Sequence, residues 1–134
     1  MKIYLGSDHA GFALKQKIKI FLTKNKIPHE DLGDFSQNNT DDYPDFIIPV
    51  AKKVAQENQT KGIIIGGSGQ GEAITANRIK GVRAVVYYGK NLNIIKLSRE
   101  HNDANILSLG ARFLSEKEAL KAVEVWLKTS FKAG

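Results

Sequence analysis

The chain has 134 residues, of which 42% are hydrophobic and none is cysteine, and its formal net charge is +6. This length predicts a single domain over residues 1–134, and the absence of cysteine excludes a disulfide framework and a thiolate zinc site. No apolar run approaches the roughly 20 residues that span a membrane, and the apolar start at Met1–Gly6 is too short for a signal peptide, so we expect a cytoplasmic protein without a membrane partner.

Apolar segments of strand length alternate along the chain with longer segments whose apolar residues recur at helical spacing. In chain order we predict the strand Lys2–Gly6, the helix Phe12–Lys26, the strand His29–Leu32, the helix Asp45–Gln59, the strand Gly62–Ile65, the helix Gly71–Lys80, the strand Val82–Tyr88, the helix Asn91–Glu100, the strand Asn105–Leu109 and the helix Ser115–Thr129. This alternation, with short connections, predicts an α/β fold. The architecture would be a Rossmann-like three-layer α/β/α sandwich around a five-stranded parallel sheet with strand order 2-1-3-4-5.

Three local features refine these boundaries. The segment Gly33–Pro44 is predicted to be a polar loop. Pro49 fits the second helix only in its first turn, because proline removes a hydrogen bond in a helix interior. Ser115 and Glu118 have the spacing of a capping box, which predicts the start of the last helix.

Two unusual segments follow strands that the predicted order places side by side. Asp8 and His9 follow the first strand, and the glycine-rich segment Gly66–Glu72 follows the third. In open parallel sheets, ligands bind beyond the carboxyl ends of the strands, where the strand order reverses. Both segments are therefore expected to line one crevice.

The glycine-rich segment GGSGQGE is suited to bind an anion through its backbone. The N–H groups of Gly67 to Gly71 and the Ser68 hydroxyl can donate to a phosphate, or to oxygen charge that develops during a reaction. Glu72 would lie in the first turn of the next helix, where it either acts on a ligand or only complements the helix dipole, which favours its charged form. The glycine spacing matches neither a Walker loop nor the dinucleotide motif, which disfavours NAD.

Other polar residues also have two interpretations each. Asp8 and His9 either bind a ligand or form a turn. The pair His101–Asn102 precedes the fifth strand, at the opposite end of the predicted sheet, and either is functional or closes a helix. Arg112 follows the fifth strand and is either a phosphate contact or a surface charge. The positive charge fits a lysine-rich surface or a phosphorylated ligand, and its even spread argues against nucleic acid.

Five motifs together make the chain resemble one family. They are GSDHAG (Gly6–Gly11), DYPDF (Asp42–Phe46), GGSGQGE (Gly66–Glu72), ANRIKGVRA (Ala76–Ala84) and REHNDANILSLGAR (Arg99–Arg112). In this order they resemble type B ribose-5-phosphate isomerase, in the family that includes the galactose-6-phosphate isomerase subunits. The resemblance extends from Met1 to about Trp126. It implies an α/β/α sandwich and an aldose–ketose isomerase, without metal or nucleotide cofactor, that interconverts ribose 5-phosphate and ribulose 5-phosphate through a cis-enediol(ate).

The resemblance also implies roles for individual residues. Many members have a cysteine base at the position of Gly66, whereas a branch with GGSGxGE uses its glutamate, which corresponds to Glu72. Ring opening would fall to His101, assisted by Asp8, and the Ser68 hydroxyl would stabilise the enediolate. The implied substrate-binding residues are Asp8, His9, Tyr43, Gly67, Ser68, Gly69, Gln70, Gly71, Asn102 and Arg112.

The resemblance further implies a homo-oligomer, at least a dimer, with active sites at the interface. The His101–Asn102 segment of one subunit would reach the Asp8 and glycine segments of the other. Family members usually hold the phosphate with arginine or histidine residues beyond the last helix, and here those contacts are missing or Lys132 replaces them in part. Three alternatives stay open: an isomerase of six-carbon aldose phosphates, a non-catalytic sugar-phosphate-binding protein, and a flavodoxin-like flavin or nucleotide binder.

Overall fold

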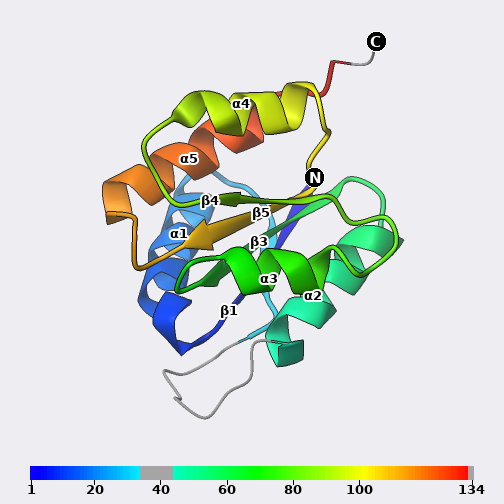
Figure 1. Cartoon of the computed structure of the whole chain (residues 1–134), viewed down its shortest axis with the longest axis horizontal. Helices are drawn as coiled ribbons and strands as arrows, with labels where there is room; N and C mark the ends of the chain where they lie inside the picture. The colour runs from blue at the N-terminus through cyan, green and yellow to red at the C-terminus, as the bar shows by residue number, and fades with distance from the viewer. Residues whose placement is uncertain (34–43, 133–134) are drawn as a thin grey trace.

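Five parallel strands form one sheet in the computed structural model, which describes residues 1–33 and 44–132 (Figure 1). The strands are β1 (Lys2–Ser7), β2 (His29–Asp31), β3 (Thr60–Gly66), β4 (Ala84–Tyr87) and β5 (Ile106–Gly110). The helices are the 3-10 turn η1 (His9–Gly11), α1 (Phe12–Lys24), α2 (Pro44–Gln56), α3 (Gln70–Ala76), α4 (Leu92–Glu100) and α5 (Glu116–Lys128). The predicted α/β fold with a five-stranded parallel sheet is confirmed.

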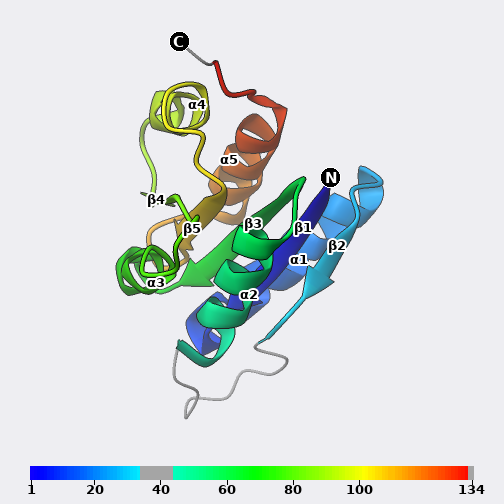
Figure 2. The ribbon, with the colours of Figure 1, turned by 90° about the vertical axis from the view of Figure 1, so that its right-hand side faces the viewer.

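The helices cover both faces of the sheet, which makes three layers (Figures 1 and 2). Helices α2 and α3 pack on one face, and α1, α4 and α5 pack on the other. Residues alternate between these faces along each strand. In β3, Ile63 and Ile65 join the core beneath α1 and α5, whereas Ile64 joins the core beneath α2. A strand that is buried on both faces explains the continuous apolar run in the sequence.

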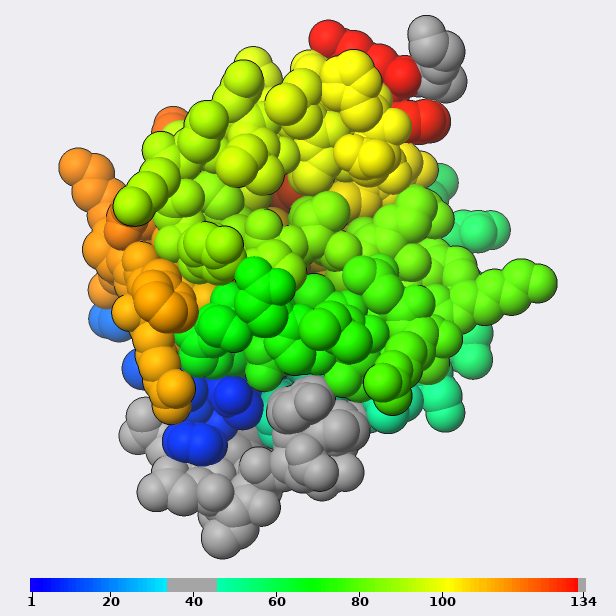
Figure 3. All heavy atoms as spheres, viewed as in Figure 1, coloured from blue at the N-terminus to red at the C-terminus, as the bar shows by residue number. Residues whose placement is uncertain are grey.

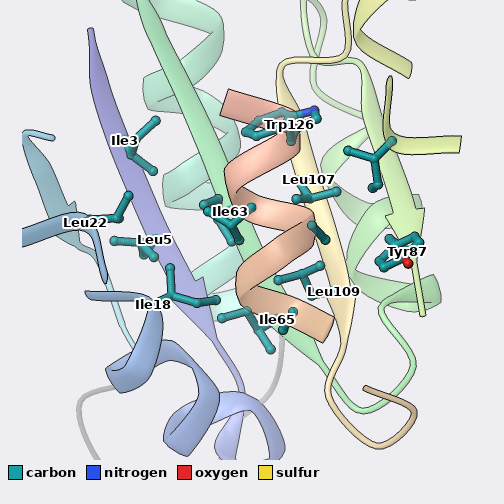
Figure 4. Packing of buried hydrophobic residues seen from close by; sticks show 14 residues of the cluster. Ile3, Leu5, Ile18, Leu22, Ile63, Ile65, Tyr87, Leu107, Leu109 and Trp126 are labelled. Atoms are coloured by element: carbon teal, nitrogen blue, oxygen red, sulfur yellow. The ribbon is translucent and has the colours of Figure 1, made fainter. Parts of the chain in front are cut away.

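The larger of the two cores lies between the sheet and α1, α4 and α5. Figure 4 shows strand residues such as Ile63 and Leu107 beside the indole of Trp126, which is fully buried. Burial of this apolar surface is the main force that holds α5 against the sheet. The capping box predicted at Ser115 and Glu118 is present and fixes the first turn of α5.

The predicted strand order 2-1-3-4-5 is wrong, because the observed order is β2-β1-β3-β5-β4. β5 takes the interior position, where every one of its residues is buried, and β4 takes the edge, where three of its four residues are partly exposed. The connection from β4 through α4 then runs back toward β3, with α4 on the face of α1 and α5, as right-handed crossovers require. The exchange leaves β1 beside β3, so the two segments that follow these strands are neighbours, as predicted.

The position of β5 brings its carboxyl end beside the carboxyl end of β3. The N–H of Ala111 donates to the Gly66 carbonyl oxygen at 2.8 Å, and the N–H of Arg112 donates to the Gly67 carbonyl oxygen at 2.9 Å. The segment that follows β5 is therefore tied to the glycine-rich segment that follows β3.

Several helix boundaries differ from prediction by up to four residues, and the differences in α2 and α3 have a clear physical cause. Helix α2 begins at Pro44, and Pro49 lies inside it, because burial of Ile47 and Val50 against the sheet outweighs the lost hydrogen bond. Helix α3 ends at Ala76, before the predicted Lys80. There the Asn77 side-chain amide exchanges hydrogen bonds with the backbone of Ala84 and directs the chain into β4. Within the described residues, no helix is both long and apolar enough to span a membrane.

Candidate active site

The segment after β1 is joined to β3 at the predicted crevice. The Asp8 carboxylate accepts a hydrogen bond of 2.9 Å from the N–H of Gly11, and the N–H of Asp8 donates to the Ile65 carbonyl oxygen at 3.2 Å. Gly11 packs so closely on Ile65 that a Cβ there would lie 2.6 Å from the isoleucine side chain. The Asp8 carboxylate is therefore held in a fixed position above the ends of β1 and β3.

His9 carries a polar atom without an internal partner. Its side chain is partly buried, and its Nδ1 atom is buried without a hydrogen bond to any residue in the described part of the chain. A buried polar atom without a partner is costly. The His9 ring would lose that cost if it turned so that Nδ1 could bond a ligand.

The glycine-rich segment is held in place from both sides. Gly69 adopts a left-handed backbone with φ of +82°, and its carbonyl oxygen accepts a hydrogen bond of 2.7 Å from the Ser108 hydroxyl of β5. Gly110 lies against the Ser68 carbonyl, in a space too small for a Cβ atom. The segment is thus a rigid turn that leads into α3.

Internal contacts use some of the donors that we expected this segment to offer. The N–H of Gln70 donates to the Ser68 hydroxyl at 3.2 Å, and the N–H of Gly69 lies where it favours the ionised Glu72 carboxylate. The N–H groups of Gly67 and Ser68 have no internal acceptor in the part of the chain that the structure describes. Because the Ser68 oxygen is the acceptor for Gln70, its hydroxyl hydrogen stays free to donate.

Glu72 places a buried carboxyl group over the end of β3. It is the third residue of α3 and is 6% exposed. The carboxyl group occupies the space directly over Gly66, where a Cβ atom would overlap it. Position 66 therefore requires glycine, because any side chain there would take the space of the Glu72 carboxyl group.

The surroundings raise the pKa of the Glu72 carboxyl. Burial is the main cause, and the negative charge of Asp8 acts in the same direction. The backbone N–H groups of Glu72 and Gly69 oppose the rise. Burial thus outweighs the helix N-terminus, which we expected to favour the charged form. A glutamate whose pKa lies nearer to neutral pH is a better proton-transfer base.

Arg112 places a positive charge beside the glycine-rich segment. Its guanidinium lies against Gly67, with Nη1 3.1 Å from the position that a Cβ atom there would take. The side chain is exposed, and it forms no ion pair with the described carboxylates. This guanidinium is available to a phosphate group.

One chain does not bring all the predicted residues together. His101 and Asn102 are exposed and directly follow α4. The end of α4 lies at the end of the sheet opposite to the start of α3, which holds Glu72 (Figure 1). Lys132 is held beside the same turn, since its Nζ atom lies 3.1 Å from the Glu100 carboxylate. Tyr43 lies outside the described residues. Within residues 1–33 and 44–132, no three His, Asp or Glu side chains gather as potential metal ligands.

Ser108 is a residue of this site that the sequence-based prediction missed. Its hydroxyl supports Gly69 from within β5, where it is fully buried. The available signal was a single hydroxyl in the otherwise apolar run Ile106–Gly110. Such a buried hydroxyl requires a hydrogen-bond partner.

Comparison with known proteins adds to this geometry. The family model described as Ribose/Galactose Isomerase matches residues 3–134. Ribose-5-phosphate isomerase B of Mycolicibacterium paratuberculosis is 40% identical over 129 residues, which cover 96% of this chain and 80% of the relative. The crystal structure of ribose-5-phosphate isomerase B from Mycoplasma genitalium with bound ribulose-5-phosphate superposes with a TM-score of 0.94 at 37% identity, covering 99% of this chain and 87% of the other. The enzyme of the same name from Clostridium thermocellum gives a TM-score of 0.92 at 43% identity, covering 100% and 88%.

Proposed function

This chain belongs to the ribose/galactose isomerase family, and from that premise we propose that it interconverts D-ribose 5-phosphate and D-ribulose 5-phosphate. The observation that carries the proposal is the buried Glu72 carboxyl, which lies over Gly66 beside a segment with unused hydrogen-bond donors. An aldose–ketose isomerisation needs a base at carbon and donors for a developing enolate oxygen.

In the proposed reaction Glu72 takes the proton from C2 of the open-chain aldose. The electron pair of the broken C–H bond forms the C1–C2 double bond of an enediol(ate). The Ser68 hydroxyl and the N–H groups of Gly67 and Ser68 donate to the oxygen that becomes negatively charged. Glu72 then returns the proton to C1, while the hydroxyl proton on the C2 oxygen is transferred to the C1 oxygen, so that C1 becomes a CH2OH group and C2 a carbonyl. The raised pKa of Glu72 suits both transfers.

Substrate binding in this proposal uses the groups that lack internal partners. Arg112 binds the phosphate, the backbone N–H groups beside Gly67 bind the oxygen at the other end of the sugar, and His9 bonds a sugar hydroxyl. Gly69 and Gln70 form part of the surface on which the sugar lies in this proposal. Tyr43 stays a predicted contact by resemblance to the family.

Ring opening by His101 requires a second copy of the chain, since His101 and Glu72 lie at opposite ends of one sheet. An isologous dimer with two-fold symmetry would place the His101–Asn102 turn of each subunit beside the Asp8 carboxylate of the other. We therefore propose that the active protein is a homo-oligomer, at least a dimer. As a separate point, we propose that it works in the cytoplasm.

An apolar surface between the two ends supports this assembly. Exposed apolar side chains include Ile74 on α3, Ile94 and Leu97 on α4, and Tyr88 and Phe113, whose ring centroids lie 5.9 Å apart. Among the described strands, β4 pairs only with β5, so its outer edge lies open between α3 and α4 (Figure 3). Apolar patches and open strand edges of this kind are typical of surfaces that a partner covers.

The direct test is conversion of ribose 5-phosphate by the wild type and by Glu72→Gln, both measured with EDTA present. We expect wild-type activity to survive EDTA and kcat of the variant to fall at least about a hundredfold, with binding retained. A variant within a few-fold of the wild type would refute the assignment of Glu72. Higher kcat/KM for six-carbon phosphates would change the proposed substrate, and binding without turnover would indicate a binding protein.

A further inference from the structure

Ser108 connects the centre of the sheet to the start of α3. It lies in the middle of β5, its side chain is fully buried, and its hydroxyl donates to the Gly69 carbonyl oxygen at 2.7 Å. The fit is tight, because a Cβ atom on Gly69 would lie 3.1 Å from the Ser108 Oγ atom. In a water-free interior such a hydrogen bond strongly favours one position of its acceptor.

Gly69 in turn determines where Glu72 lies. It is the residue before α3, and its carbonyl oxygen also accepts the hydrogen bond of 3.1 Å from the N–H of Ala73. Its own N–H favours the ionised form of the Glu72 carboxyl. Both polar groups of Gly69 are therefore used to orient the first turn of α3 relative to β5.

We propose that Ser108 is a positioning residue for the Glu72 carboxyl, acting through the carbonyl group of Gly69. The inference rests on the proposed function, because it takes Glu72 to be the base. Ser108 itself is fully buried and needs no contact with the substrate. Its hydroxyl holds the Gly69 turn while Glu72 exchanges a proton with the sugar.

Loss of this hydroxyl should change the rate and its pH dependence more than substrate binding. For Ser108→Ala we expect kcat to fall about two- to twelvefold, the equivalent of one net hydrogen bond, with little change in KM. The acid limb of the pH profile of kcat should move to higher pH, because the N–H of a less firmly held Gly69 stabilises the Glu72 carboxylate less. Asp8, whose charge acts on the Glu72 carboxyl, stays in place in this variant, and so does Arg112, which lies against Gly67.

Ser98→Ala provides a matched control. Ser98 is also a buried serine, and its hydroxyl donates to the Ile95 carbonyl oxygen at the same distance of 2.7 Å, but within α4. Both alanine variants should lose similar stability, and only Ser108→Ala should move the acid limb. Ser108→Thr keeps a hydroxyl and should retain most of the wild-type kcat and pH profile. Ser108→Cys serves if Ser108→Ala does not fold, because its thiol is a weaker hydrogen-bond donor than a hydroxyl. Its kcat should lie below that of Ser108→Thr, and its acid limb should lie at higher pH.

A second readout separates this inference from the proposed function. The Glu72 carboxyl can be titrated by carbon-13 NMR, where its signal is identified by its loss in Glu72→Gln. A wild type that does not convert ribose 5-phosphate would overturn the proposed function, and the titration would still test Ser108. A Ser108 variant whose Glu72 titration and acid limb match those of Ser98→Ala would overturn the positioning role.

Discussion

The carboxyl group of Glu72 lies in the space that a side chain at position 66 would fill. A Cβ atom on Gly66 would overlap both carboxylate oxygens, so this glycine and this glutamate depend on each other. Any side chain at position 66 must push the carboxyl away from the crevice. Backbone conformation is not the reason for this glycine, since no left-handed φ occurs at Gly66.

We predict that Gly66→Ala and Gly67→Ala affect different kinetic constants. The methyl group at position 66 displaces the Glu72 carboxyl, and a misplacement of about 1 Å costs roughly a hundredfold in kcat. The methyl group at position 67 meets the flexible guanidinium of Arg112 and should mainly raise KM. Steady-state kinetics on both variants measures the two effects. Equal loss of kcat in both variants would contradict this division.

We predict that Glu72→Gln raises the stability of the protein while it lowers kcat. The folded-state pKa of Glu72 lies above its ordinary value of about 4.3, so the folded state favours the protonated form. Its contribution to stability is therefore complete below that value and is lost as pH rises through the folded-state pKa. Glutamine has no such loss.

Urea unfolding of Glu72→Gln and the wild type should give similar free energies near pH 4. The advantage of the variant should grow as pH rises toward neutrality and then stay constant. An advantage that is the same at every pH would contradict a raised pKa at Glu72.

Periodicity and segment order predicted the layers of the fold and one half of the site. Asp8 and the segment Gly66–Glu72 meet in the crevice because β1 and β3 are neighbours in both the predicted and the observed strand order. The order of β4 and β5 was missed because it depends on how much of each strand the completed fold buries. A local pattern contains no such information.

The close contacts between residues on different strands could not be predicted from the sequence. The overlap of the Glu72 carboxyl with the space over Gly66, and the bond from Ser108 to Gly69, join residues whose approach only the packed sheet defines. The position of His101 was different, since its place before the fifth strand already predicted that it lies far from Glu72 in one chain. The structure agrees with that expectation.

We predict that Asp8→Asn moves the acid limb of the pH–rate profile to lower pH. The Asp8 charge contributes to the raised pKa of Glu72, after the larger effect of burial. Asparagine removes this charge and keeps an oxygen that can accept from the N–H of Gly11. The pH at which the residual activity falls to half of its maximum, measured between pH 4 and 8, gives the position of the acid limb. This position does not depend on how far kcat itself has fallen. A limb at the wild-type position would exclude electrostatic coupling between Asp8 and Glu72.

We predict that Asp31→Asn destabilises the fold at neutral pH by about 1.5–3 kcal/mol, the value of a hydrogen bond to a charged group, because it removes one charged partner of the fully buried Lys15. Burial alone would raise the pKa of Asp31, but hydrogen bonds from Lys15, Gly33 and Lys19 lower it on balance. The carboxylate therefore stabilises the protein above its ordinary pKa, and this contribution is lost as pH falls through the lower folded-state pKa.

The stability difference between Asp31→Asn and the wild type should accordingly shrink below about pH 4. Glu30→Gln is the control on the same strand, since its ion pair with Lys2 is exposed and contributes little. Denaturant unfolding at several pH values measures both variants. Equal effects of the two substitutions would show that burial of the Asp31 pair is unimportant.

We predict that two inactive variants restore activity when they share a dimer. Glu72→Gln lacks the base and His101→Ala lacks the ring-opening group, so a mixed dimer contains one intact site and one site without either group. Random exchange of equal amounts should yield about a quarter of the wild-type activity, well above either parent. The control pairs His101→Ala with the double variant Glu72→Gln/His101→Ala, which cannot form an intact site. No recovery, in samples where native mass spectrometry detects mixed dimers, would mean that each chain builds its own site. Recovery would mean that the opposite ends of the sheet act together only through the partner subunit.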